Sequence, residues 1–318
     1  MASQAELTKP LLQLASTGPR WRAYAQLVRL PNVFTAMADI ALAWLGAVAL
    51  RTPASRWPSF LLLMCASVCL YAGGMIWNDF FDIEQDRRER PFRPIPSGRI
   101  TRRSAALAGG IALALGVFLA WQAGSLAGTG GPLAISASLV LAITLYDGLL
   151  KRTWAGPVAM GACRFLNVLL GLSVAGNNFP MGARIFLALV VGLYIVGVTW
   201  FARTEARESE RSSLMSAAGV MLASLILALA VPVTLENSNP SILFPYLLVA
   251  LGFGIGIPVC RAIARPAPSH VQRAVKRSIM GLVVLDAVLA TALAGAIGLI
   301  ILVLLLPALY LGRWIYST

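Results

Sequence analysis

Charged residues are scarce in this chain of 318 residues: they make up 12% of it, against roughly 25% in an average soluble protein. The only histidine, His270, lies in a basic stretch, so a haem or zinc site built on several histidines is excluded. The four cysteines form no Cys-x-x-Cys pair, and we expect them to be ordinary packing residues in or beside apolar stretches. Hydrophobic residues instead reach 58%, a composition that predicts an integral membrane protein.

Apolar runs near or above the roughly 18 residues that cross a bilayer recur along most of the chain. We therefore predict an all-α membrane protein whose nine transmembrane helices form a single domain over residues 33–318. In residues 1–32, Trp21, Tyr24 and Leu27 recur at helical spacing, which is typical of a helix lying on the cytoplasmic interface. The predicted spans are residues 33–50, 58–77, 104–123, 131–150, 154–175, 183–202, 214–234, 241–260 and 279–306.

The net charge of +13 is unevenly distributed along the chain. If the N-terminus is cytoplasmic, the loops on that side hold 21 lysines and arginines and the opposite side holds four. Nine spans with this bias predict a multi-pass protein of the plasma (inner) membrane with a cytoplasmic N-terminus, an external C-terminus and a cytoplasmic active site. Topology accounts for most of the basic excess, so we expect no nucleic acid partner, although the lipid bilayer and phosphorylated substrates also attract basic residues.

The strongest local pattern is Asn-Asp-x-x-Asp-x-x-x-Asp at residues 78–86, directly after the second span. If that helix continues, Asn78, Asp82 and Asp86 lie at successive i+4 steps, and Asp79 joins them on the same face. Carboxylate and amide oxygens are the ligands that Mg²⁺ prefers, with water and a substrate phosphate completing the shell. The pattern predicts a magnesium site. The alternative is a solvated loop in which these acids pair with the arginines nearby.

Further polar residues are expected on the same side of the membrane. The loop after the acids turns at residues 94–98 and carries Arg93 and Arg99, which suit two-pronged binding of a phosphate. The fourth span delivers a group of residues to this side, and the sixth span leads to a second acidic cluster with its two glutamates at i, i+3. These residues are Tyr146, Asp147, Lys151 and Arg152 after the fourth span, and Glu205 and Glu208 after the sixth.

A few polar residues are predicted inside the apolar spans themselves. Arg164 and Asn167 lie near the centre of the fifth span, and a buried arginine in a membrane is by default a functional hypothesis. Its alternative is a structural bridge to Asp39 or Asp147. Asp39 in the first span is expected to make a structural hydrogen bond, and Asp286 stands alone in the ninth.

Two acid-rich segments after even-numbered spans of a nine-helix chain resemble the UbiA superfamily of intramembrane prenyltransferases. The resemblance covers most of the chain from about Arg29, and the first motif is complete at residues 78–86. Further agreement comes from the Tyr-x-x-x-x-Lys-Arg pattern at residues 146–152, from Arg93 and Arg99, and from Arg164 with Asn167. The family's second motif is normally made of aspartates, whereas this chain has Glu205 and Glu208, which places it in an outlying branch.

The resemblance implies a UbiA-like bundle with a central cavity that opens sideways to lipid, two Mg²⁺ ions, and a polyprenyl diphosphate bound between the two acidic motifs. It implies Mg²⁺-dependent transfer of the prenyl group to a lipophilic acceptor, expected to be aromatic. Tyr146 would stabilise the allylic cation through its ring, and Asp147 would orient the acceptor or take its proton. The implied metal ligands are Asn78, Asp79, Asp82, Asp86, Glu205 and Glu208. The implied diphosphate-binding residues are Asn78, Arg93, Arg99, Arg152, Arg164 and Asn167. The implied catalytic residues are Asp79, Asp82, Asp86, Tyr146, Asp147 and Lys151.

Other functions have weaker support. A CDP-alcohol phosphotransferase requires Asp-Gly-x-x-Ala-Arg followed by further spaced aspartates, and that series is absent from the sequence. A catalytically altered binding protein of the same family or a membrane transporter would fit the glutamates of the second cluster and the intramembrane residues Asp39, Arg164 and Asp286. Against a transporter, the sequence has no paired inverted repeat with broken apolar helices.

Overall fold

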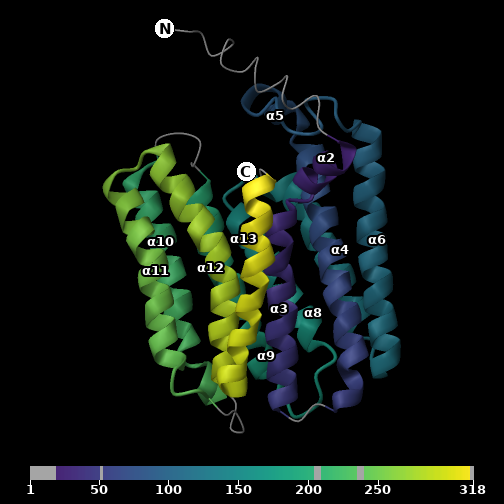
Figure 1. Cartoon of the computed structure of the whole chain (residues 1–318), viewed down its shortest axis with the longest axis vertical. Helices are drawn as coiled ribbons and strands as arrows, with labels where there is room; N and C mark the ends of the chain where they lie inside the picture. The colour runs from purple at the N-terminus through teal and green to yellow at the C-terminus, as the bar shows by residue number, and fades with distance from the viewer. Residues whose placement is uncertain (1–18, 51–52, 204–208, 235–239, 316–318) are drawn as a thin grey trace.

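The computed structural model describes residues 19–50, 53–203, 209–234 and 240–315. In these ranges the chain is helical and has no strand, and its long helices stand side by side in one bundle (Figure 1). Eight helical segments in the described ranges are long and apolar enough to cross a membrane, and α8 is a shorter apolar helix. The predicted all-α membrane bundle is therefore confirmed.

The bundle helices begin with α3 (Leu30–Ala49), α4 (Trp57–Phe81), α6 (Arg102–Ala127) and α7 (Gly131–Leu145). They continue with α8 (Gly156–Leu172), α9 (Met181–Ala202), α10 (Arg211–Ala228), α11 (Phe244–Ala264) and α12 (Pro268–Ala294). Prolines stand in the first turn of α3, α4, α7, α8, α11 and α12, where the missing N–H has no helical partner to lose. A local sequence feature therefore determines where these six helices begin.

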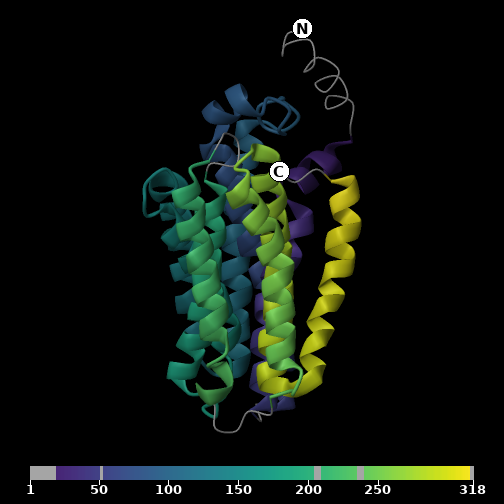
Figure 2. The same ribbon diagram turned by 90° about the vertical axis from the view of Figure 1, so that its left-hand side faces the viewer.

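The count of nine spans is not confirmed, because the last apolar run does not form one helix. After α12 the chain reverses at Gly295, whose positive φ of 71° is a conformation that favours glycine. The segments η4 (Gly295–Leu304) and α13 (Leu305–Trp314) then return along α12 and α3 (Figure 1). The predicted single span over 279–306 is therefore wrong. The end of α13, with Arg313, lies at the same end of the bundle as α2 (Figure 2), whereas the predicted topology separates the two.

One end of the bundle carries a small cap formed by α2 (Arg20–Leu27), α5 (Ile83–Glu89) and the loop after α5 (Figure 1). The cap has its own apolar cluster, separate from the main core, in which the loop inserts Ile95 and Ile100 against Leu27 of α2 and Ile76 of α4. Burial of these side chains fixes the loop relative to the end of α4. The cap therefore positions the residues around the acid-rich stretch.

Close packing between α8 and α3 depends on Gly171. A Cβ atom at this position would lie 2.6 Å from the Cβ of Ala43 and 3.3 Å from the Cα of Ile40. Any larger residue would push the two helices apart. This contact brings the polar residues of α8 next to those of α3.

Candidate active site

The acid-rich residues lie on one continuous face, as the sequence predicts. The backbone N–H of Asp82 donates to the carbonyl of Asn78 at 3.0 Å, and that of Asp86 donates to the carbonyl of Asp82 at 2.8 Å. Helical geometry thus persists across the junction of α4 and α5, although Asp82 itself belongs to neither helix. Asn78, Asp79, Asp82 and Asp86 are only 3 to 8% exposed.

Arg93 connects two of these carboxylates from the loop after α5. Its Nη1 donates to Oδ2 of Asp86 at 2.7 Å and to Oδ1 of Asp79 at 3.1 Å, and the arginine is itself buried. Burial raises the pKa of the Asp86 carboxyl, and Arg93 opposes that rise. The expected proximity of Arg93 to the acids is therefore observed, and its guanidinium compensates their mutual repulsion.

Cations from two other elements complete the pairing. Arg29, which directly precedes α3 in the sequence, donates from Nη2 to Oδ1 of Asp79 and to Oδ1 of Asn78, each at 3.4 Å. Lys151 forms an ion pair with Oδ2 of Asp82, and Arg152 lies 3.8 Å from Oδ1 of the same residue. The alternative that the acids pair with nearby basic residues thus describes part of the arrangement, but the acids are buried rather than solvated.

Arg99 lies apart from the acids. Its guanidinium donates to the side-chain oxygen of Gln26 in α2 and to the backbone carbonyl of Phe92, both at 2.8 Å. Burial lowers the pKa of this guanidinium. These contacts tie the loop to the cap, and the predicted role of Arg99 toward a diphosphate stays a prediction.

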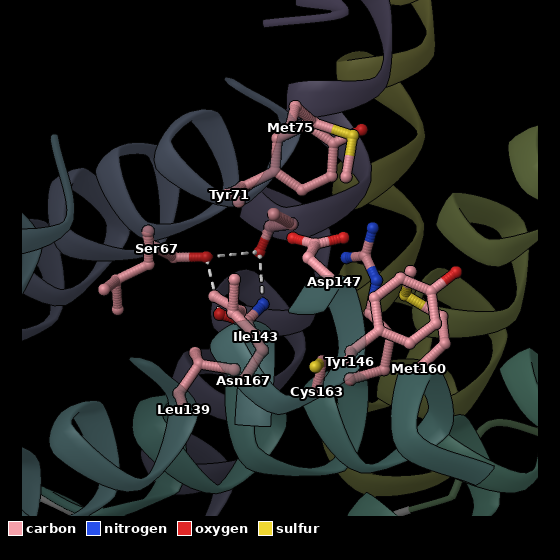
Figure 3. A pocket seen from close by; sticks show the side chains of 14 residues that line it. Ser67, Tyr71, Met75, Leu139, Ile143, Tyr146, Asp147, Met160, Cys163 and Asn167 are labelled. Atoms are coloured by element: carbon pink, nitrogen blue, oxygen red, sulfur yellow. Dashed lines mark hydrogen bonds between the residues drawn. The ribbon is translucent and has the colours of Figure 1, made fainter. Parts of the chain in front are cut away.

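A cavity of about 530 Å³, its open mouth included, lies beside the acidic face between α3, α4, α7 and α8 (Figure 3). Tyr146 and Asp147 line it from η2 (Tyr146–Leu150), a π-helical turn in which the Lys151 N–H donates five residues back to the Tyr146 carbonyl at 2.9 Å. Such turns interrupt a regular helix and are frequent at functional sites. Asn78 Nδ2 donates to Asp147 Oδ1 at 2.9 Å. This bond joins the acidic face to the wall of the cavity.

A polar network closes another part of the cavity wall. Arg164 donates to Asp39 Oδ2 at 3.1 Å and to Thr35 Oγ1 at 2.7 Å, so the structural bridge to Asp39 forms. Asn167 Nδ2 donates to the same Asp39 oxygen at 2.7 Å, and the Ser67 hydroxyl donates to Asn167 Oδ1 at 2.7 Å. Figure 3 shows the hydrogen bond between Ser67 and Asn167 in the cavity wall. Arg164 and Asn167 thus belong to the cavity but not to the acidic face.

Several contributors were not singled out from the sequence. The sequence indicated only a topological role for Arg29. Its position directly before a span with a proline in its first turn nevertheless indicates that it lies at the membrane surface, beside the ends of other spans. Tyr71, Ser67 and Thr35 carry no separate sequence signal, because single polar residues in apolar helices are common. Glu205 and Glu208, the predicted second acidic cluster, lie outside the described residues.

The donor set of the acidic face fits Mg²⁺ in its chemistry: three carboxylates and an amide oxygen on successive turns. In the described part of the chain no three acidic, histidine or cysteine side chains converge as a ready metal cluster. Each of the three carboxylates is engaged by a cation. Divalent metal binding at this face therefore requires the arginine and lysine partners to move from the carboxylates.

Comparison with known proteins gives a consistent result. The model of the UbiA prenyltransferase family matches residues 35–275. Digeranylgeranylglyceryl phosphate synthase of Ignicoccus hospitalis is 34% identical over an alignment of 160 residues that covers 43% of this chain and 50% of that protein. Protoheme IX farnesyltransferase of Caulobacter vibrioides is 30% identical over 194 residues, covering 60% of this chain and 56% of that protein. The chain thus spans about half the length of these curated relatives.

The fold also has a solved counterpart. The structure of a UbiA homologue from Archaeoglobus fulgidus bound to GPP and Mg²⁺ is similar with a TM-score of 0.56. The similarity covers 84% of this chain and 99% of that one, at 16% sequence identity. At this identity the likeness concerns the arrangement of helices alone.

Proposed function

The chain belongs to the UbiA prenyltransferase family, and from this premise we propose that it transfers a prenyl group from a polyprenyl diphosphate to a lipophilic acceptor, with Mg²⁺ as its metal. The observation that carries the proposal is the hydrogen bond from Asn78 to Asp147. It joins the acidic face, whose donor atoms suit a metal ion, to the wall of a largely apolar cavity, whose lining suits a prenyl chain. The Mg²⁺ and GPP in the solved homologue support the same assignment.

In the proposed complex with the prenyl diphosphate, the acids bind the metal and their present cationic partners bind the diphosphate. Asn78, Asp79, Asp82 and Asp86 would hold Mg²⁺, and Glu205 and Glu208, which follow α9 in the sequence, would add ligands. When bound, the metal supplies positive charge for the departing diphosphate. Arg93, Lys151 and Arg152, released from the carboxylates, then donate to the diphosphate oxygens, because each lies within contact distance of the acids that carry the metal.

The chemical step breaks the allylic C–O bond and forms a bond from the same carbon to the acceptor. Pyrophosphate leaves with the bonding electron pair, while the ring of Tyr146 in the cavity wall faces the cationic carbon. Asp147 accepts the acceptor's proton at its carboxylate. The apolar side chains that line the remainder of the cavity, among them Leu70, Leu139 and Ile143, bind the chain and exclude water.

The acceptor is lipophilic, but its class differs among the relatives: one is named for a glyceryl phosphate product and another for protoheme IX. The reaction takes place at the end of the bundle that carries α2, α5 and most of the basic loops. We assign this end to the cytoplasmic side of the plasma membrane, on the positive-inside rule. A transport function gains no support, because the intramembrane residues Arg164 and Asp39 pair with each other.

The test is release of pyrophosphate by the purified protein from GPP and longer prenyl diphosphates, with Mg²⁺ and a panel of lipophilic acceptors. Asp82→Asn keeps the shape of the side chain but removes the charge, and we expect turnover to fall at least 100-fold while the protein stays folded. Glu84→Gln, an exposed acid on α5, is the matched control and keeps full turnover. Equal activity of Asp82→Asn and the wild type would refute the proposed site.

A further inference from the structure

Two carboxyl groups lie in the interior of the bundle, away from the acidic face. Asp39 on α3 and Asp286 on α12 are both 0% exposed, and these two helices pack against each other. The two side chains interact with each other. The proposed transfer reaction uses neither of them.

The hydrogen-bond donors around this pair are unequally shared. Asp39 Oδ2 accepts from Arg164 at 3.1 Å and from Asn167 at 2.7 Å. Asp39 Oδ1 and both oxygens of Asp286 are buried, and no donor in the described part of the chain reaches them. A buried carboxylate without any hydrogen-bond donor is energetically costly. If both groups were ionised, three of their four oxygens would therefore lack the donors that they need.

The charges lead to the same conclusion. Arg164 is the cation that interacts with both carboxyls, and it neutralises one of them. The hydroxyl of the buried Tyr194 on α9 is not available as a donor to Asp286, because it donates to the backbone carbonyl of Ser278 at 2.8 Å. Two ionised carboxylates would therefore leave one negative charge uncompensated in the apolar interior.

We propose that Asp286 is a neutral carboxylic acid whose O–H donates to Asp39 Oδ1, so that Arg164, Asp39 and Asp286 form a charge-neutral triad across α8, α3 and α12. Asp39 is the ionised member because it already receives two donors, one of them a cation. Asp286 carries the proton because it receives none. One proton then supplies a donor for Asp39 Oδ1 and removes the uncompensated charge.

The triad has a consequence for the cavity. Arg164 lines the cavity wall and lies over the ring of Tyr71 at 5.5 Å. Its two terminal nitrogens are fixed by Asp39 and Thr35, and Asp286 in turn fixes Asp39. Asp286 is therefore a positioning residue for the cation of the cavity. This last step rests on the proposed function, whereas the position of the proton does not.

Infrared spectroscopy of the purified protein tests the proton directly. We expect the wild type at neutral pH to show the carbonyl stretching band of a protonated carboxyl group that Asp286→Asn lacks. Thr291→Val, which changes another buried polar residue of α12, is the matched control and keeps the band. A wild-type spectrum identical to that of Asp286→Asn in this region would overturn the proposal. Thermal stabilisation of the wild type by added sodium would also overturn the proposal, because it would assign a bound cation, and not a proton, to the site.

Turnover and thermal stability provide the second measurement. Asp286→Asn still donates to Asp39 through its amide and should keep the KM and thermal midpoint of the wild type. Asp286→Leu removes the donor and should lower the midpoint and raise the KM for the prenyl diphosphate several-fold, since Arg164 loses its fixed partner. Equal behaviour of the two variants would overturn the positioning role. Absence of turnover in every form, wild type included, would refute the proposed function but leave the infrared result intact.

Discussion

The replacement Arg93→Met separates two roles proposed for the cations at the acidic face, namely compensating the buried carboxylates and binding the diphosphate. The side chain of Arg93 is 7% exposed and bridges Asp79 and Asp86, whose side chains are 5% and 4% exposed. Breaking a buried ion pair by removing one partner costs about 3–5 kcal/mol. We expect a loss near the lower end, about 3 kcal/mol, because Asp79 keeps its contact with Arg29. The variant should therefore unfold at a clearly lower temperature than the wild type.

Magnesium should offset this loss in the variant more than it stabilises the wild type. With Arg93 absent, no guanidinium in the described part of the chain donates to Asp86, so the metal binds more tightly. At a concentration of 100 times its Kd the metal contributes about 2.7 kcal/mol. Turnover should nevertheless fall at least 10-fold, because the diphosphate loses one of its donors. The variant is thus expected to be stabilised by Mg²⁺ more strongly and to react more slowly.

The assay is thermal unfolding in detergent over a range of Mg²⁺ concentrations, together with pyrophosphate release. Arg88→Met on the exposed side of α5 is the matched control, and it should leave both measurements unchanged. The reasoning fails if Mg²⁺ stabilises Arg93→Met less than the wild type. That result would mean that the carboxylates bridged by Arg93 do not bind the metal.

Three further outcomes are expected. Asp147→Asn should lower kcat by about 100-fold or more through loss of the proton acceptor, while calorimetric Mg²⁺ affinity stays unchanged; a change in affinity alone would contradict this role. Gly171→Ala should cost about 1–3 kcal/mol by overpacking against α3, whereas Gly254→Ala, in open space on α11, should not lower the unfolding midpoint. Because burial raises the pKa of Asp86, Mg²⁺ affinity should start to fall on acidification at a higher pH than for an exposed aspartate; a fall confined to its ordinary range, near pH 3.9, would argue against metal binding there.

The parts of the site that follow from local periodicity could be predicted from the sequence. The shared face of Asn78, Asp82 and Asp86 depends only on i+4 spacing and on continuation of a helix, and both hold. The partners of these acids depend on which distant elements meet at the same place. Arg29 lies 50 residues from Asp79 and Lys151 lies 69 residues from Asp82, so only the tertiary arrangement reveals that they meet.

The last apolar run shows the limit of hydropathy as a guide to topology. The run over residues 279–306 is predicted as one span, long enough to be tilted or broken, but its hydropathy does not show where a break would fall. In the structure α12 begins at Pro268, among polar residues, and ends at Ala294. The chain then turns at Gly295, in the middle of the run, and its helical segments continue to Trp314. The signal for reversal is a single glycine, which an apolar average does not register.

The pairing of acids and bases at the acidic face also explains how a face with so many buried charges stays folded. Three buried aspartates on one helix face would repel one another, and Arg29, Arg93 and Lys151 cancel that repulsion. Under the proposed function, the carboxylates would bind Mg²⁺ and the cations that now pair with them would bind the diphosphate. Both states are then close to neutral, so binding exchanges one set of ion pairs for another instead of creating new buried charge. Because the carboxylates and Arg93 are already buried, binding of the donor adds no further cost for their desolvation.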